Sequence, residues 1–510
     1  MKKTFIIPTI LTAAALGLAS CDMNLTPAGS VFPENALQTI EDAERLRAGY
    51  MIAFRGRVSG NMAYTADLAS DLYHATTNWG NRGGTYYNWI YTSVDGDAES
   101  VWSGRYSGIS NLNFFIDKAN SADKSNWTEE NIAKLSVYKG EAFFLRAFYH
   151  FQLAEKFCQD YEGNESTYGI PYVKHYNPTS DQTQYPDRGT LAETFAEINN
   201  DLDSAEAYLT TPGAEAHNYL TADAVKALRA RVALNMRDYP TAIENASALV
   251  NSGVYPLVSL SDTAAFRAIW SVDSGDEAII QLDASYPDDL PSGYAYQFIS
   301  YDANNDLYGP DYIPEQWVID LYEEYPGDIR LNANFKEVTV TLPPGNAEFN
   351  VWIFYKFVGN PELKDQASRG NSGVNKVKPF RIPEQYLILA EAYARNGQAA
   401  EACNVLNTLR KARIPGYTDA TYSGERLLEE IFNERVRELM GEGFYWTDVK
   451  RYHRNIARGA AQDGARDAIY LPSNNESFHR SWGDYRYVWP IPQEELDASP
   501  NIANQQNPGY

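Results

Sequence analysis

The stretch 382–458 constrains the fold more than any other part of the sequence, because its apolar residues recur with a helical period. Pro383 stands at the start of the pattern, Gly397 interrupts it and Pro415 ends it, so 382–415 predicts a helix, a tight turn and a second helix. Small residues allow the two helices to approach closely, at Ala390, Ala394, Ala399 and Ala402. We therefore expect an antiparallel helical hairpin.

A further helix is predicted at 427–440, and its two faces differ in character. Apolar residues form one stripe, made of Leu427, Leu428, Ile431, Phe432, Val436, Leu439 and Met440. Charged residues stand opposite this stripe, at Glu429, Glu430, Glu434, Arg437 and Glu438. We expect the helix to pack on its neighbours through the stripe and to present its charged face to water.

A weak internal repeat extends the hairpin pattern to the N-terminal half. The stretch 227–250 aligns with 387–410 so that small residues coincide, Ala230 with Ala390 and Ala242 with Ala402. Further candidate members are 145–157 and 191–209. A solenoid of such hairpins can exceed the size of one ordinary core, as 510 residues require. The predicted fold class is mainly α, with a tetratricopeptide-like helical-hairpin scaffold.

A long loop-rich stretch interrupts the predicted scaffold. Short β-like runs at 278–283 and 337–342 alternate there with loops rich in Pro, Gly and Asn. Loops of this length in a compact body tend to be functional. The predicted single unit 34–510 has its helical scaffold at 34–252 and 380–458, an insertion with a few short strands at 253–379 and a C-terminal segment at 459–510.

The N-terminus predicts export and lipid attachment. Residues 1–20 combine a basic start at Lys2 and Lys3 with an apolar run too short for a permanent membrane span, and small residues precede Cys21. The sequence Leu-Ala-Ser-Cys at 18–21 resembles a bacterial lipobox, whose cysteine is lipidated. We predict a lipoprotein signal peptide at 1–20, lipidation of Cys21 and a polar tether at 21–33, with an ordinary signal and a chance cysteine as the alternative.

Charge and cysteine content limit the partners. A net charge of −24 repels phosphate backbones, so nucleic acid is not an expected partner. Cys158 and Cys403 lie on apolar helical stretches, where we favour two buried free thiols; a disulfide between them stays open.

Many aromatic residues stand in loops instead of helical stripes. They gather in Gly- and Asn-rich sequence at 74–92 and 286–317, where no helical period explains them. Sugars stack on such rings and exchange hydroxyl hydrogen bonds with amides, carboxylates and guanidinium groups. We therefore predict a ligand site where the two stretches meet.

Four sequence features are shared with a known family. They are the lipobox ending in Cys21; the pattern Glu434-Arg435, Glu438-Leu439, Glu442-Gly443, Trp446, Asp448 and Arg451; the stretch Trp489-Pro490-Ile491-Pro492; and the final Gln506-Asn507-Pro508-Gly509-Tyr510. Through them the chain resembles, over essentially its whole length, the SusD/RagB family of cell-surface nutrient-binding lipoproteins. Phe444 departs from the pattern, because the family often has Arg or His there. The resemblance implies a tetratricopeptide-like scaffold that carries a loop-rich face.

The predicted ligand-binding residues follow from the loop composition and from the aromatic arc that the resemblance implies. Trp79 is the first choice of stacking platform, with Tyr296 and Trp317 facing it. Asn81 and Arg82 are expected to donate hydrogen bonds to hydroxyl groups. The full predicted set is Trp79, Asn81, Arg82, Tyr86, Tyr87, Trp89, Tyr294, Tyr296, Tyr301, Tyr308 and Trp317. For any single ring the alternative is that it anchors its own loop.

The sequence matches no common catalytic or metal-binding motif. Glu434, Glu438 and Glu442 stand near several arginines, which favours a structural salt-bridge network over acid/base catalysis. The acidic string 302–306 resembles the start of a calcium loop, but Leu307 stands where glycine is needed, so an EF-hand is excluded. A looser structural calcium site remains the alternative to a solvated turn. We predict no cofactor, no metal ligand and no catalytic residue.

The leading interpretation is a non-catalytic protein that captures a nutrient polymer or oligomer, with a glycan as the expected ligand. The resemblance implies delivery to a SusC-like TonB-dependent transporter and a lipid-anchored position at the outer membrane, facing the cell exterior. The scaffold motifs resemble the peptide-binding RagB branch equally, so a peptide ligand is the first alternative. A surface glycoside hydrolase is the second.

Overall fold

The computed structural model describes residues 35–58, 61–213, 218–293, 295–342, 347–367, 372–459, 461–462 and 479–510. The predicted signal peptide, Cys21 and the tether lie outside these residues, as does Tyr294. Among the residues that the structure describes, no helix combines the length and apolar character that crossing a membrane requires.

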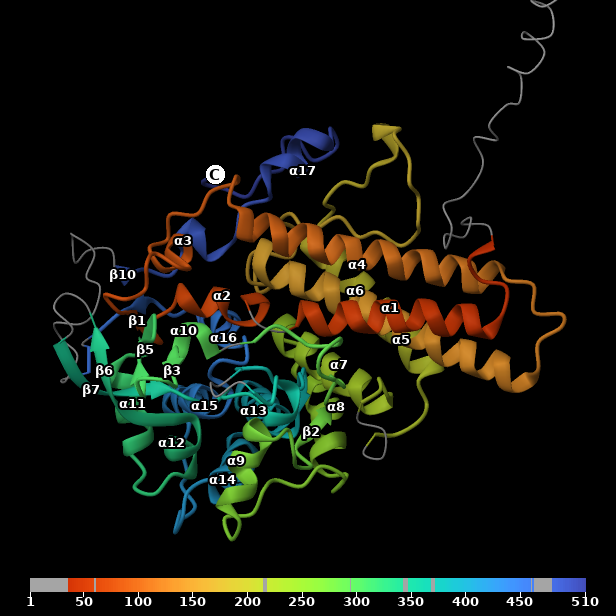
Figure 1. Ribbon diagram of the computed structural model, residues 1–510. Coiled ribbons are helices and arrows are strands. Elements are labelled where there is room, and N and C mark those ends of the chain that lie inside the picture. Colours follow the sequence, from red (N-terminus) through yellow and green to blue (C-terminus); the bar gives the residue numbers. More distant parts are fainter. Residues whose placement is uncertain are drawn as a thin grey trace, which may run out of the picture.

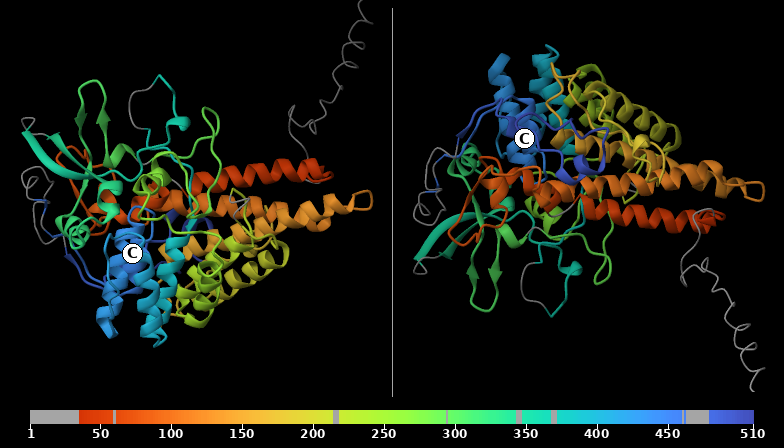
Figure 2. Two further views of the ribbon diagram at one scale, coloured as in Figure 1. Left: turned by 90° about the horizontal axis from the view of Figure 1, so that it is seen from below. Right: turned by 90° about the horizontal axis from the view of Figure 1, so that it is seen from above.

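Long helices build the scaffold, and most of the strands gather at one end of them (Figures 1 and 2). The predicted mainly helical class with short strands is confirmed. The scaffold helices are α1 (Ile40–Arg57), α4 (Gly96–Ser121), α5 (Glu129–Phe157), α6 (Leu191–Tyr208), α7 (Ala222–Met236), α8 (Tyr239–Val250), α13 (Ile382–Arg395), α14 (Ala399–Lys411), α15 (Gly424–Leu439) and α16 (Tyr445–Arg451).

Several scaffold helices begin where a side chain satisfies one of their free N–H groups. Thr39 caps α1 and Thr190 caps α6, each accepting a hydrogen bond from the third residue of its helix, Asp42 or Glu193. The carboxylates of Asp42 and Glu193 bond back to the backbone N–H of the cap, so both starts are capping boxes. Thr128 caps α5 in the simpler way.

The internal repeat corresponds to two hairpins, α7 with α8 and α13 with α14, and α8 packs against α13. The aligned alanines are all fully buried, at Ala230, Ala390, Ala242 and Ala402. Gly397 adopts a φ of 80° in the turn between α13 and α14, which glycine tolerates without strain. Both predicted hairpins are therefore confirmed. Cys158 and Cys403 are buried free thiols, as favoured.

All of the charged face of α15 except Glu429 is buried, so the prediction that this face points to water is wrong. Glu434 and Arg437 are 0 % exposed and Glu438 is 1 % exposed. Arg330 Nη1 approaches Glu434 Oε1 to 2.6 Å, and Arg410 Nε approaches the other oxygen to 2.7 Å. A charged stripe in one helix cannot reveal that arginines distant in the sequence cover it.

Short helices and strands fill the stretch between α8 and α13, and others lie between α1 and α4 and after α16. A four-stranded sheet has the order β3-β4-β6-β7, and its long antiparallel pair joins β6 to β7 from Phe335↔Phe354 to Leu342↔Ala347. The short elements are α2 (Asn61–Leu68), β1 (Tyr73–Ala75), α3 (Gly84–Tyr87), α9 (Thr263–Ser271), β2 (Ala278–Ile280), α10 (Ala295–Phe298), β3 (Tyr301–Asp302), β4 (Leu307–Tyr308), β5 (Tyr312–Pro314), α11 (Gln316–Glu323), α12 (Ile329–Asn334), β6 (Phe335–Leu342), β7 (Ala347–Phe354), β8 (Phe380–Arg381), β9 (Ile456–Ala457), β10 (His479–Arg480) and α17 (Gln493–Ala498).

Candidate ligand-binding site

The two aromatic loops that were predicted to share a site meet in the structure. β1 pairs antiparallel with β5, with Tyr73 opposite Pro314 and Ala75 opposite Tyr312. Beyond the strands, Thr76 N donates to the carbonyl of Asp311 at 2.8 Å. The predicted meeting of these distant segments is therefore confirmed, whereas ligand binding there stays a prediction.

The turn after β1 directs Arg82 toward the second loop. Gly80, Asn81 and Gly83 have φ values of 55°, 62° and 68°, which glycine and asparagine adopt more readily than other residues. Arg82 donates from Nε and Nη2 to the carboxylate of Asp311. The side chain of Arg82 is 41 % exposed and that of Asp311 only 1 %. A buried carboxylate thus fixes a guanidinium group that still reaches the solvent.

Most of the predicted stacking rings lie in the core. Tyr86 and Tyr87 are 0 % exposed, Trp89 is 2 % exposed and Trp79 is 6 % exposed. Trp79 packs edge-on against Tyr87 and Tyr312, with ring centroids 5.4 and 6.2 Å apart. In this conformation none of the four rings presents a face to a ligand. Their burial supports the alternative that they anchor the loop.

Trp317 also takes part in the packing of the fold. It lies on α11, half-buried against the core, and its Nε1 donates to the carbonyl of Asp71 at 2.7 Å. The side chain of Tyr296 is not among those described. The predicted arrangement of Tyr296 and Trp317 facing Trp79 is therefore not part of the site described below.

The ring of Tyr301 in the second loop remains accessible, whereas that of Tyr308 is buried. Tyr301 and Tyr308 face each other across the β3–β4 hairpin with centroids 4.7 Å apart; Tyr301 is half-buried and Tyr308 is 8 % exposed. Lys336 Nζ donates to Tyr308 Oη at 2.7 Å and lies 5.4 Å from the ring centroid of the half-buried Tyr355. We call Asn81, Arg82, Tyr301, Lys336 and Tyr355 the loop face.

The hairpin is tied to the turn that carries Arg82. Gly309, directly after β4, donates its N–H to the carbonyl of Ser300 at 3.1 Å, and its own carbonyl accepts from Asn78 Nδ2 at 2.7 Å. Asn81 and Lys336 are exposed. The loop face therefore combines accessible rings with amide, guanidinium and ammonium donors, which is the chemistry that hydroxylated ligands need.

The acidic string of the hairpin closes its own turn. Asp302 Oδ1 accepts from Asn304 N at 2.9 Å, and Asp302 Oδ2 accepts from Asn305 Nδ2 at 2.6 Å. Asp306 Oδ1 accepts from Tyr301 Oη at 2.8 Å. These contacts are those of a solvated Asx-type turn, the commoner of the two interpretations.

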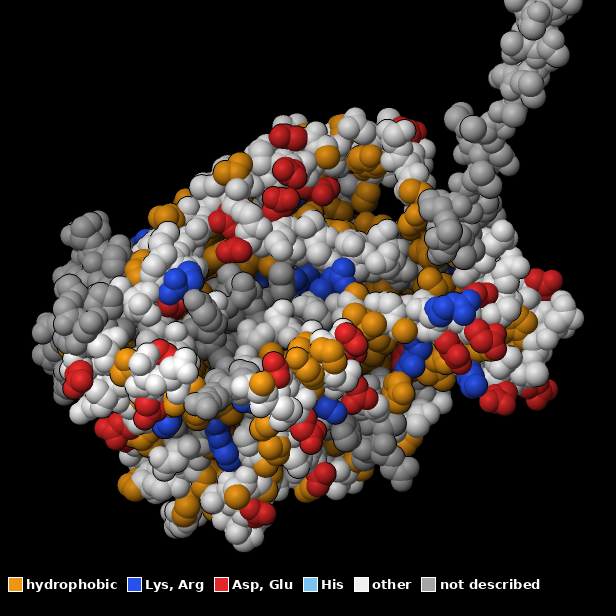
Figure 3. All heavy atoms as spheres, in the orientation of Figure 1, with side chains coloured by type: hydrophobic (Ala, Val, Ile, Leu, Met, Phe, Trp, Pro, Cys, Tyr) orange, Lys and Arg blue, Asp and Glu red, His pale blue; other side chains and the backbone are white. Residues whose placement is uncertain are grey.

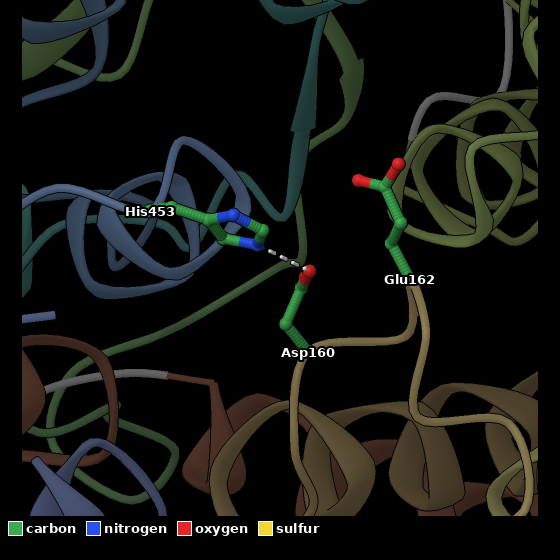
Figure 4. A group of neighbouring side chains, drawn as sticks. All are labelled: Asp160, Glu162 and His453. Atoms are coloured by element: carbon green, nitrogen blue, oxygen red, sulfur yellow. Dashed lines mark hydrogen bonds and ion pairs between the residues drawn. The ribbon is translucent and has the colours of Figure 1, made fainter. Parts of the chain in front are cut away.

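One cluster among the described residues has the composition of a metal site. The ligand atoms of Asp160, Glu162 and His453 lie within 4.8 Å of one another, and Figure 4 shows the first and last of these side chains pointing together. However, Arg237 Nη2 lies 2.6 Å from Asp160 Oδ2, and Arg237 Nε lies 3.3 Å from Glu162 Oε2. The guanidinium group already supplies the positive charge that a cation would bring.

The sequence analysis did not predict a buried polar cluster around Glu315 and Arg458. Glu315 is 0 % exposed, its Oε2 accepts from Gly459 N at 2.7 Å, and burial raises its pKa to about 9. Arg458 donates to the carbonyl of Ser70 at 3.0 Å and lies 3.7 Å from the ring centroid of Tyr87. The cluster joins segments from both halves of the chain, so no local pattern marks it.

The motif glutamates form the predicted salt-bridge network. Burial opposes ionisation of Glu438, but Arg413, Arg381 and Arg330 outweigh it and hold its pKa well below the usual range. Glu442 pairs with Lys356 and Arg381, both at 2.6 Å. Two more buried pairs involve motif residues, Arg435 with Asp448 at 2.8 Å and Arg451 with Glu391, which lies outside the motif, at 2.8 Å. The predicted network is confirmed.

Two family models match the chain. The model of the SusD family matches residues 310–510, and a model described as starch-binding and associating with the outer membrane matches residues 32–234. A curated relative is SusD-like protein P38 of Formosa agariphila, which is 21 % identical over 508 residues, covering 91 % of this chain and 95 % of that protein.

Solved structures share the whole architecture. A SusD superfamily protein from Bacteroides thetaiotaomicron is 26 % identical with a TM-score of 0.75, covering 92 % of this chain and 100 % of that one. A SusD-like carbohydrate binding protein from Bacteroides vulgatus is 21 % identical, also with a TM-score of 0.75, covering 92 % and 98 %. The matched family models, the shared fold and the buried motif network together show that the chain belongs to the SusD-like family.

Proposed function

We propose that this protein binds a glycan at the bacterial surface without transforming it and passes it to a TonB-dependent outer-membrane transporter. One matched family is described as starch-binding and associating with the outer membrane, which supports both the glycan ligand and the location. The name of the relative from Bacteroides vulgatus describes it as carbohydrate binding.

The loop face carries the proposal. Arg82 is held by Asp311 while it reaches the solvent. Tyr301 offers a half-buried ring on the hairpin that Gly309 ties to Asn78, and Tyr355 offers another beside Lys336. A guanidinium group that is already fixed loses little conformational entropy when a hydroxylated ligand binds. Lys336 adds a donor over the rings, 4.9 Å from the centroid of Tyr308. We place the glycan across these side chains.

Binding without turnover agrees with the condition of the acidic side chains. A glycosidase needs one carboxyl that keeps a proton near neutral pH beside a second that is ionised, and both must reach the substrate. Glu434 and Glu438 are buried and arginine-paired. They therefore lack both the access and the proton that acid catalysis needs. A turnover assay on the purified protein tests the hydrolase alternative.

A peptide ligand is the second candidate. Peptides would use backbone hydrogen bonds and charge pairs more than ring faces, and Arg82 and Lys336 are suited to a carboxylate. The half-buried tyrosines of the loop face favour a sugar over a peptide. The full chain in mild detergent, applied to an array of neutral glycans and peptides, decides between them: glycan spots alone are expected, and peptide spots alone would overturn the proposal.

Lipidation of Cys21 and a transporter partner complete the proposed role. Mass spectrometry of the mature N-terminus should find an acyl group that a Cys21→Ala variant lacks, and that variant should leave the membrane fraction. Affinity purification from native membranes in mild detergent should recover a barrel protein. Recovery of none would argue against delivery to a transporter.

A further inference from the structure

A groove along α1 shares no residue with the loop face. Its volume is about 540 Å³, and residues that line it include Arg47, Met51, Arg55, Tyr138, Tyr219 and Asp289. The helix α1 lies on the face shown in Figure 3, where basic, acidic and hydrophobic side chains are interspersed along it. Arg47 and Arg55 stand eight residues apart on the helix, so the groove floor extends over about 12 Å.

Arg47 is held rigidly at one end of the groove. Its Nε and Nη2 donate to the two oxygens of Glu141, both at 2.6 Å, and Glu141 is 0 % exposed. The guanidinium carbon lies 4.8 Å from the ring centroid of Tyr138 and 4.7 Å from that of Tyr219. Tyr50 Oη, which donates to Glu141 at 3.2 Å, also holds the carboxylate in place. Bidentate pairing and two ring contacts leave this side chain little freedom to lose on binding.

The rest of the groove offers rings and apolar surface to the solvent. Tyr219 is 45 % exposed, and Ile52, on the groove floor, is 53 % exposed. Tyr138 Oη lies 3.5 Å from Glu44 Oε1 at the rim. An exposed ring and an exposed isoleucine beside fixed polar groups provide both stacking and hydroxyl recognition.

The charges in the groove favour a neutral ligand. Glu141 neutralises Arg47, and Asp289 pairs with Arg55. Glu44 adds a carboxylate to the lining, as does Asp283, which is 62 % exposed and pairs with Lys376 Nζ at 3.1 Å. An anionic polymer would meet these carboxylates, whereas a neutral hydroxylated chain can bond to both signs of group.

We propose that the α1 groove is a second binding site, for a short neutral oligosaccharide. The proposal shares only its ligand class with the proposed function and uses none of the loop-face residues. A second site on the same body would raise the avidity for a long glycan that spans both.

The test is calorimetry of the full chain in mild detergent with maltoheptaose, cellohexaose, xylohexaose, mannohexaose and laminarihexaose as neutral probes, trigalacturonate as the anionic probe and hexalysine as the cationic peptide. Tyr219→Ala should weaken one neutral-probe site about ten- to a hundredfold. Ala48→Arg, on the groove floor, should block the same site. Neither should change the melting temperature, because both side chains are exposed.

Tyr168→Ala is the matched control. Tyr168 is 46 % exposed, and the guanidinium carbon of Arg188 lies 5.2 Å from its ring centroid. Outside the groove it therefore has the same kind of contact between a ring and a guanidinium group. Unchanged neutral-probe binding in both Tyr219→Ala and Ala48→Arg would overturn the proposal, as would tighter binding of trigalacturonate or hexalysine. If Tyr301→Ala alone abolishes every isotherm, the groove is not a site. If Tyr219→Ala alone abolishes every isotherm, the groove is a binding site and the loop-face proposal fails.

Discussion

Arg413 in the scaffold and Arg82 on the loop face both pair with buried carboxylates, yet their surroundings differ. Arg413 is 0 % exposed and contacts Glu277 at 2.8 Å and Glu438 at 3.0 Å, both fully enclosed. Arg82 is 41 % exposed beside a buried Asp311. The same residue types therefore hold the fold together in one region and reach the solvent in the other. The two uses differ in the exposure of the arginine side chain, which cannot be read from the sequence.

The largest expected effect is on the scaffold network. Glu438→Ala removes the carboxylate that Arg330, Arg381 and Arg413 share, and removing one member of a buried pair costs about 3 to 5 kcal/mol. We expect a loss at the upper end of that range in the free energy of unfolding, measured by urea denaturation.

The matched control is Glu429→Ala on the same helix. Glu429 and its partner Arg454 are 40 % and 36 % exposed, so the loss should stay below about 1 kcal/mol. Equal losses in the two variants would contradict the distinction between buried and solvated charge.

Trp79→Ala tests whether the loop aromatics belong to the fold or to the site. The ring is 6 % exposed and packs against Tyr87 and Tyr312, so we expect an unfolding free energy lower by about 3 kcal/mol. Tyr485→Ala, which removes a ring that is 41 % exposed, should cost much less. A Trp79→Ala protein that keeps its stability and loses ligand would restore the ring to the role of a stacking platform.

The pKa values of two buried glutamates, one in each region, are shifted in opposite directions. Burial raises the pKa of Glu315 to about 9, whereas the arginines around Glu438 hold its pKa low against the effect of burial. The carboxyl group of a glutamate in the unfolded chain has a pKa of about 4.3. Glu315 thus contributes stability that is complete below that pH and is lost as the pH rises toward about 9, while the contribution of Glu438 is present above about pH 4.3 and is lost on acidification.

Glu315→Gln should therefore flatten the alkaline side of the stability profile. Each proton linked to unfolding contributes a slope of up to about 1.4 kcal/mol per pH unit. We expect the urea midpoint of the wild type to fall between about pH 6 and about pH 9, and that of Glu315→Gln to fall less. Glu323→Gln on the exposed side of α11 is the control. Parallel profiles for wild type and Glu315→Gln would show that this carboxyl is not protonated in the fold.

The sequence predicted local structure well where one segment carried its own evidence. The alanine spacing and Gly397 predicted the stacked hairpins. The meeting of the two aromatic loops was also foreseen, because rings without helical period had to be explained.

Burial was not predictable from these patterns. Trp79 resembled a binding ring because glycines surround it, but those glycines let the loop fold back so that the ring enters the core. The charged face of α15 looked solvated because its partners, Arg330 and Arg413, lie on other segments. Both errors have one physical cause: partners from distant segments decide exposure.

The smallest expected change in stability, and the most direct test of a separate binding region, comes from Tyr301→Ala. The ring is half-buried at the hairpin surface, so the unfolding free energy should change by less than about 1 kcal/mol. Affinity for the glycan selected on the array should fall about tenfold or more by calorimetry, while Glu429→Ala keeps wild-type affinity. Unchanged affinity in Tyr301→Ala, or a loss of affinity that only follows a loss of stability, would contradict a glycan site on the loop face.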